Sequence, residues 1–226
     1  MPGQYEIKPP AEFLEKDEVL AIIKAVPSVS LHPERDQLFL RTMWETGGRV
    51  SEVNHLIKGR ILDSDLVIVL QNLKQDPIPK GLTEKVKEEL RAKKSIDYKK
   101  PYVSKSLIDD LLTYCREHSI GNGDKDWVFQ GNKNPSVPLG RHYIWWIVKK
   151  AAKEAGVEKF SKSRGRKVYS WPHLFRHACA MFLLDRTGST EKAQRQLGHK
   201  FLVTTQAYAI LRLKKSDKEI SDLDWG

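Results

Sequence analysis

The sequence predicts a mixed α+β fold that is mostly helical and carries one small antiparallel sheet. Three observations support this prediction. Apolar residues recur at helical spacing over most of the 226-residue chain. A β-branched apolar run at Leu66–Leu70 breaks that pattern and predicts a strand, and Tyr102–Val103 predicts its partner at about 100–103. No run of about 18 apolar residues occurs, so we expect no membrane-spanning helix.

The first third of the chain predicts three helices before the strand. A Pro-containing lead-in over 1–11 precedes a helix at about 12–26. Pro33 opens a second helix at about 33–46, which ends at Gly47–Gly48, and a short third helix starts near residue 50. The apolar side expected for the first helix consists of Phe13, Leu14, Val19, Leu20, Ile23 and Val26.

The rest of the chain predicts further helices and one basic loop. We expect helices at 82–94 (charged and exposed), 105–118, 140–155, 174–187 and 190–197, and a last one that Thr204–Thr205 opens. The most basic segment, 159–169 (KFSKSRGRKVY), is interpreted as a flexible loop that lies on phosphate. The core side of the helix at 140–155 is expected to be Ile144, Trp145, Ile147, Val148 and Ala151.

Composition narrows the class of partner. The net charge is +10 and the sequence pI is about 9.5, which favours a polyanion such as DNA, RNA or an anionic membrane surface over a merely basic surface. Cys115 and Cys179 are interpreted as buried thiols of a reducing compartment. His173 and His177 have a zinc-binding spacing, but Leu174 stands where a zinc protease needs Glu, so we expect no metal.

Several cations have positions suited to a phosphodiester. Arg49 follows two glycines, which let a backbone approach a bulky anion closely. Arg176 comes three residues after His173 on the same helix face, and His199 again follows a glycine. Guanidinium groups bind phosphate oxygens in a bidentate way, so two Arg and two His would suit a pentavalent phosphorane. Each of these residues alone is a weak signal.

Their order along the chain is more specific. The runs are Gly47-Gly48-Arg49-Val50-Ser51-Glu52, His173-x-x-Arg176, Leu197-Gly198-His199 and Thr204-Thr205-Gln206-Ala207-Tyr208. Over residues 12–211 this order resembles the tyrosine recombinase (phage integrase) family. That family has Arg, His-x-x-Arg, Leu-Gly-His and then a Tyr nine residues after the last His. Tyr208 stands at that spacing. The resemblance implies the family's catalytic-domain fold for 12–211, with a C-terminal tail over 212–226.

The resemblance also implies a role for each matched residue. Tyr208 would attack the scissile phosphate and form a 3′-phosphotyrosyl bond, so no metal, ATP or other cofactor is expected. Arg49, Arg176 and His199 would hold the non-bridging oxygens, and His173 would assist proton transfer or add a hydrogen bond. Glu52 would support Arg49 or a neighbouring histidine.

The resemblance implies that a lysine on a tight β-hairpin is the proton donor to the leaving oxygen. Lys74, just after the predicted strand, is our choice, but residues 75–98 look inserted here, and Lys99 and Lys100 remain alternatives. The expected DNA contacts of the basic loop are Lys162, Arg164, Arg166 and Lys167.

The implied activity is site-specific recombination of double-stranded DNA by four protomers, in the cytoplasm at the nucleoid. The tail would dock on a neighbouring protomer or fold back on its own domain. The family's N-terminal DNA clamp is missing, and 1–11 resembles the interdomain linker, so the chain is either a piece of a longer protein or a minimal enzyme. The alternatives are a DNA-binding regulatory fragment and a type IB topoisomerase-like enzyme.

Overall fold

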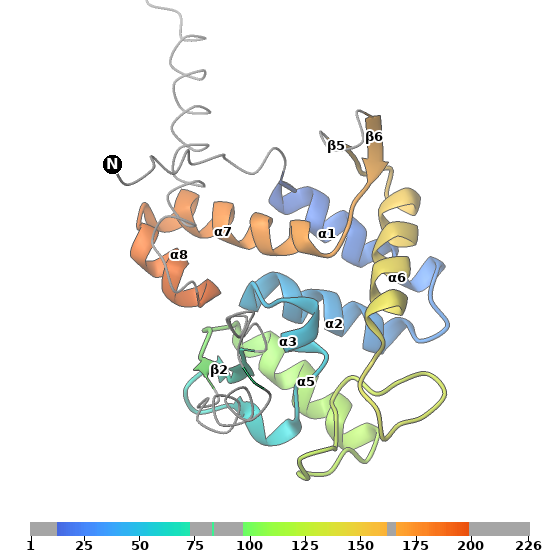
Figure 1. The fold of residues 1–226 in the computed structure, drawn as a ribbon, viewed down its shortest axis with the longest axis vertical. Helices are drawn as coiled ribbons and strands as arrows, with labels where there is room; N and C mark the ends of the chain where they lie inside the picture. The colour runs from blue at the N-terminus through green and yellow to red at the C-terminus, as the bar shows by residue number, and fades with distance from the viewer. Residues whose placement is uncertain (1–12, 73–82, 84–96, 162–165, 199–226) are drawn as a thin grey trace, which may run out of the picture.

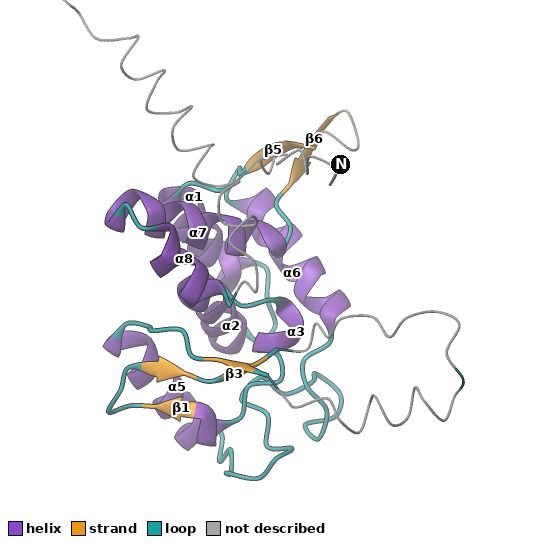
Figure 2. Cartoon of the chain, turned by 60° about the vertical axis from the view of Figure 1, so that its left-hand side comes forward, coloured by secondary structure: helices purple, strands orange, loops and turns teal. Residues whose placement is uncertain are grey.

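The structure is a computed structural model, and it describes residues 13–72, 83, 97–161 and 166–198. Most of the described chain is helical, as predicted. Two small sheets, formed by residues 61–71 with 98–99, lie next to each other at one end of the molecule, and the hairpin strands at 158–161 and 166–169 lie at the opposite end (Figures 1 and 2). The helices are α1 (Lys16–Ala25), α2 (Pro33–Thr46), α3 (Val50–Val53), α5 (Lys105–Glu117), α6 (Arg141–Glu154), α7 (His173–Thr187) and α8 (Thr190–Leu197), with 3-10 turns η1 (Val26–Ser28) and η2 (Lys58–Arg60).

Helix α2 is central to the helical layer, because it packs against α1, α3, α5 and α7. Its start at Pro33 and its end before Gly47 agree with the prediction. The other described helices lie within a few residues of their predicted ranges, although α1 starts later than expected, at Lys16. The helices predicted at 82–94 and after Thr204 lie outside the described residues.

The predicted strand 66–70 was wrong in detail. Leu66 has φ +53 and belongs to a turn, and the rest of the run is divided between β2 (Val67–Ile68) and β3 (Leu70–Gln71). Strand β2 pairs antiparallel with β1 (Ile61–Leu62), which was not predicted. Strand β3 pairs antiparallel with β4 (Tyr98–Lys99), and Val67 forms an antiparallel bridge with Tyr102, so the predicted partner at about 100–103 is confirmed in part and extended toward 98. A β-branched run shows where a chain is extended, but pairing depends on neighbours far away in the sequence.

The basic segment 159–169 is not an irregular loop, which corrects the prediction. Its backbone forms an antiparallel hairpin between β5 (Glu158–Ser161) and β6 (Arg166–Tyr169). The segment contains residues of high β propensity among its charges, and that propensity outweighs the charge in deciding the backbone conformation. Lys162 and Arg164 lie outside the described residues, whereas Arg166 and Lys167 are on β6. Lys159 on β5 forms an ion pair of 2.6 Å with Glu18 on α1.

The core follows the apolar helix faces, with two corrections. Leu20 and Trp145, both expected inside, are 44% and 42% exposed, while Ile22 is fully buried. On α1 the buried residues are Val19, Ile22 and Ile23, and Leu20 points away from that face because each residue turns by about 100°. Cys115 and Cys179 are buried, as predicted. In the part of the chain that the structure describes, no helix is both long enough and apolar enough to span a bilayer.

Candidate active site

Arg49 is positioned by the turn between α2 and α3. Gly47 ends α2 in the left-handed conformation (φ +58), and Arg49 is the extended residue just before α3. A Cβ on Gly47 would lie 2.4 Å from Cδ2 of Leu197, so the turn has no room for a side chain. The sequence favours close approach of an anion as the role of these glycines. The structure shows instead that Gly47 lies against the end of α8 and that its carbonyl accepts a hydrogen bond from Arg176.

Glu52 joins two cations. Its side chain is buried, and one carboxylate oxygen, Oε1, lies 2.6 Å from a guanidinium nitrogen of Arg49. The other, Oε2, lies 2.8 Å from Nζ of Lys99 and accepts the backbone N–H of Arg49 at 2.9 Å. Burial raises the pKa of Glu52, but the nearby Lys99 charge and the hydrogen bonds from Arg49 and Lys99 outweigh it, so the pKa is lowered overall. Glu52 is therefore ionised at neutral pH and holds Arg49 by both main chain and side chain.

Lys99 reaches Glu52 from strand β4. Arg49, Glu52, Lys99 and Arg176 together are called the cluster below. Only 8% of the residue is exposed, and besides the ion pair with Glu52 its Nζ donates a 3.4 Å hydrogen bond to the Leu197 carbonyl. Burial lowers the pKa of Lys99 to about 8, with Arg176 and Arg49 adding to that effect and Glu52 opposing it. The ammonium is therefore mostly charged at pH 7. The sequence offered Lys99 only as an alternative proton donor, whereas the structure places it within the cluster and leaves its neighbour Lys100 exposed.

Arg176 lies in the first turns of α7 and is 2% exposed. One guanidinium nitrogen donates to the Gly47 carbonyl, and the other donates at 2.8 Å to the Leu197 carbonyl, which Lys99 also approaches. These contacts bring together four segments that are far apart in the sequence: the α2–α3 turn, β4, α7 and the end of α8.

His173 is the exposed first residue of α7. The centroid of its ring lies 4.5 Å from the ring centroid of His177, at an interplanar angle of 85°. Burial lowers the pKa of His177 to about 3, and the charges of His173 and Arg176 act in the same direction, so His177 is neutral at physiological pH. Among the residues described, no three His, Cys, Asp or Glu side chains gather as a possible metal site.

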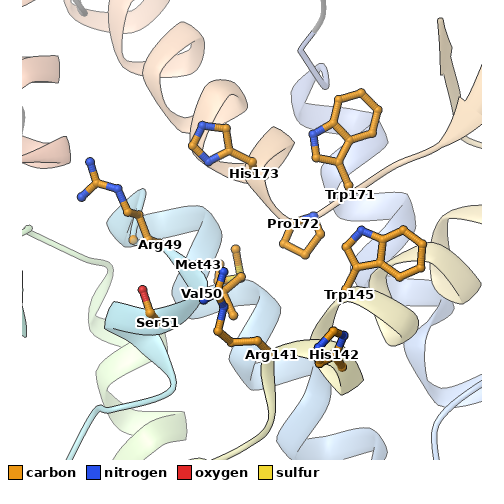
Figure 3. Close-up of a pocket in the computed structure, with 11 residues that line it drawn as sticks. Met43, Arg49, Val50, Ser51, Arg141, His142, Trp145, Trp171, Pro172 and His173 are labelled. Atoms are coloured by element: carbon orange, nitrogen blue, oxygen red, sulfur yellow. The ribbon is translucent and has the colours of Figure 1, made fainter. Parts of the chain in front are cut away.

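A groove of about 590 Å³ runs beside these residues. Arg49 and His173 border one part of it, and Arg141 and His142, from the start of α6, border another (Figure 3). Trp145 and Trp171 lie on the remaining side. The sequence reasoning missed Arg141, His142 and Trp145 as site residues. The available signal is a group of basic and aromatic residues at a helix start, of which Trp145 is expected on the core side from its helical spacing.

The structure thus brings together Arg49, Glu52 and Arg176, with His173 on the adjoining groove. Five predicted catalytic or DNA-contacting residues lie outside the described residues: Lys74, Lys162, Arg164, His199 and Tyr208. Gly198, which directly precedes His199, is described and ends α8 in the left-handed conformation.

The phage integrase family model matches residues 12–214. The chain belongs to this family. It is 28% identical over 210 residues to the tyrosine recombinase XerD of Staphylococcus saprophyticus, in a match that spans 91% of this chain and 59% of the relative. XerD of Staphylococcus aureus is also 28% identical, over 207 residues, with the same coverage. This phage integrase family member thus spans about three fifths of the length of those relatives.

Solved structures share the fold of this family member. The XerH site-specific recombinase, in a post-cleavage complex with a palindromic difH substrate, superposes with a TM-score of 0.69 at 17% identity and covers 93% of this chain and 52% of its own. The catalytic domain of bacteriophage HP1 integrase superposes with a TM-score of 0.55 at 18% identity, covering 92% of this chain and 95% of its own. The predicted fold class, a mostly helical catalytic domain of this family with small antiparallel sheets, is therefore confirmed.

Proposed function

We propose that this chain is the catalytic domain of a site-specific DNA recombinase that cleaves and rejoins DNA through a 3′-phosphotyrosyl bond at Tyr208. The observation that carries the proposal is the cation cluster beside the groove. Arg49 and Lys99 share the single carboxylate of Glu52, so this triplet has one excess positive charge. Arg49 keeps 27% of its side chain exposed and borders the groove. A phosphodiester entering the groove would supply the missing negative charge.

The cluster suits the transition state better than the ground state of such a reaction. Phosphorane formation concentrates charge on the non-bridging oxygens, and pre-positioned guanidinium donors stabilise that charge without reorganising. Arg49 is fixed by Glu52, and Arg176 is fixed by two carbonyls, so both groups are oriented before DNA binds. We assign the non-bridging oxygens to Arg49, Arg176 and His199, with Glu52 supporting Arg49.

The proposed reaction balances without an external energy source. The Tyr208 hydroxyl oxygen attacks phosphorus and loses its proton, with His173 assisting the transfer. The bond from phosphorus to the 5′ oxygen breaks, and that oxygen takes a proton, which we assign to Lys74. In the second half, a 5′ hydroxyl attacks the phosphotyrosyl phosphorus, releases Tyr208 and restores a phosphodiester. The covalent bond conserves the phosphodiester energy, so the proposal needs no ATP, metal or other cofactor.

The proposed partner is double-stranded DNA. The net charge of +10 favours it, and the solved relatives XerH and Tn1549 integrase were both determined with DNA. Arg141 and His142 on the groove, with the basic hairpin residues Lys162, Arg164, Arg166 and Lys167, are the contacts we propose for it. We further propose that four protomers act together on two DNA sites, at the nucleoid, with the catalytic domain over 12–211 and the tail at 212–226 available for docking.

A covalent-trapping assay tests this function. The chain is incubated in EDTA with nicked suicide duplexes drawn from the flanks of its gene, and adducts that survive SDS are measured. We expect an adduct that Tyr208→Phe abolishes while noncovalent DNA retention is kept. Tyr102→Phe is the matched control, because Tyr102 is 64% exposed and outside the cluster, and it should leave the adduct intact.

Three results would contradict the proposal in different ways. Salt-sensitive DNA retention without any adduct on any duplex would favour a DNA-binding regulatory fragment. Relaxation of supercoiled plasmid without strand exchange between two sites would favour a type IB topoisomerase-like enzyme. An adduct that persists in Tyr208→Phe would show that another residue is the nucleophile.

A further inference from the structure

We propose that Lys99 is a positioning residue of the phosphate-binding cluster and is not the proton donor to the leaving oxygen. The inference rests on the proposed function, because it assigns a role within that reaction. It separates two of the three lysines that the sequence leaves as alternatives, Lys74 and Lys99. Three features of the surroundings of Lys99 support it.

The first feature is that the ammonium of Lys99 contacts two groups that orient the arginines. Its Nζ lies 2.8 Å from Glu52, whose other carboxylate oxygen holds Arg49 at 2.6 Å. The same Nζ donates to the Leu197 carbonyl at 3.4 Å, and that carbonyl accepts from Arg176 at 2.8 Å. Lys99 is thus one contact away from each arginine, and losing its charge would disturb both.

The second feature is that the aliphatic part of Lys99 packs on the turn that ends α8. A Cβ added to Gly198 would lie 2.9 Å from Cδ and 3.1 Å from Cβ of Lys99, so the side chain covers this turn closely. Gly198 has φ +64 and directly precedes His199. Lys99 therefore joins strand β4 to the turn that ends α8, and that turn directly precedes His199 in the sequence.

The third feature is the position of the ammonium relative to the groove. Only 7% of the Lys99 side chain is exposed, and Lys99 is not among the described residues that border the groove, whereas Arg49 and His173 are. A proton donor must reach the leaving oxygen in the substrate. If Lys99 gave up its proton, the buried Glu52 carboxylate would keep Arg49 alone as its cationic partner. Arg176 is as buried as Lys99 and is still assigned to the phosphate, so burial by itself does not separate the two roles. The dependence of the buried Glu52 carboxylate on the Lys99 charge is what favours a structural cation over a proton donor.

Replacing the leaving oxygen with sulfur distinguishes the two roles. A suicide duplex with sulfur at the 5′ bridging position releases a thiolate, which needs no proton, so such a duplex compensates for a missing proton donor and not for a misplaced cluster. We expect Lys99→Met to slow single-turnover adduct formation about 100-fold on the oxygen and sulfur duplexes alike, as a displaced catalytic group does. Lys74→Met, the matched control, should lose about 100-fold or more on oxygen and recover on sulfur.

Further variants guard against a general folding defect. Thermal unfolding is measured on every variant, and if Lys99→Met does not fold, Lys99→Arg is used, which keeps the cation and should stay within a few-fold of the parent on both duplexes. Glu52→Gln should show the same sulfur-independent loss as Lys99→Met. The double variant should then be no slower than either single one, because both changes break the same contact.

The possible outcomes distinguish failure of the role of Lys99 from failure of the proposed function. If the parent chain forms no Tyr208-dependent adduct on either duplex, the proposed function fails and the role of Lys99 fails with it. Suppose that the parent reacts and that the sulfur duplex restores the adduct-formation rate of Lys99→Met, or of a Lys99→Arg variant that is slow on oxygen. Lys99 is then the proton donor, and this inference alone is overturned. A parent-like rate for Lys99→Met on both duplexes would also overturn it.

Discussion

Replacing Glu52 with glutamine should destabilise the protein far more than an ordinary loss of surface charge. The carboxylate is buried, and it accepts three contacts from Arg49 and Lys99. Removing one partner of a buried ion pair costs about 3–5 kcal/mol, because the remaining charge stays buried without compensation. Lys99 limits that cost, since burial already lowers its pKa to about 8 and it can release its proton near neutral pH. We therefore expect about 3 kcal/mol for Glu52→Gln, at the lower end of that range.

Thermal unfolding followed by circular dichroism at pH 7 measures this effect. For a chain of this size about 3 kcal/mol corresponds to a decrease in Tm of about 6–12 °C. Asp110→Asn is the matched control, because the ion pair between Asp110 and Arg41 has side chains that are 52% and 29% exposed. An exposed pair contributes about 1 kcal/mol at most. A Glu52→Gln decrease no larger than that of Asp110→Asn would refute the view that the Glu52 contacts hold the cluster together.

Two further predictions follow from the same cluster. Because the Lys99 pKa is lowered to about 8, its ammonium is charged below that pH and loses its proton above it, which weakens the contact with Glu52. The ratio of parent to Lys99→Arg cleavage rates should therefore be constant below pH 8 and fall above it, and a flat ratio up to pH 9.5 would contradict this. Gly47→Ala should cost about 2–4 kcal/mol in urea unfolding, since it combines left-handed strain with overpacking against Leu197. Gly156→Ala, with φ +68 and nothing within 4 Å, should cost only the strain, about 1–2 kcal/mol, and equal costs would disprove the packing argument.

The helices could be predicted from the sequence because their signals are local. Pro33 and the glycines at 47–48 mark the two ends of α2, and the apolar spacing marks its buried face. The sheets could not be predicted to the same accuracy. The run at 66–70 is divided between two sheets. Its pairing with Tyr102 was predicted, but its partners at 61–62 and 98–99 are chosen by contacts that local pattern does not encode. The hairpin at 158–169 was missed because charge obscured its β propensity.

The cationic residues of the candidate site could be predicted from the sequence, but the contacts that hold them in place could not. Arg49, His173 and Arg176 were identified by their order along the chain, and the structure places them around one cluster and its groove. Lys99 is 47 residues from Glu52 and belongs to a strand whose register depends on β3, so no spacing rule could assign their ion pair. Trp145 was misplaced because an aromatic residue on an amphipathic helix is usually buried, and here it borders the groove instead.

The cations of the site also stabilise the end of a helix. The Leu197 carbonyl belongs to the last turn of α8, where carbonyls lack partners within the helix and carry the negative end of its dipole. Arg176 and Lys99 both donate to that carbonyl, so their positive charges stabilise α8 while α8 orients them. Gly47 and Gly198 make this possible, because each adopts a left-handed turn where a side chain would collide with Leu197 or Lys99. The cluster and the docking of α8 therefore depend on each other, and a change that loosens the end of α8 loosens the proposed phosphate site as well.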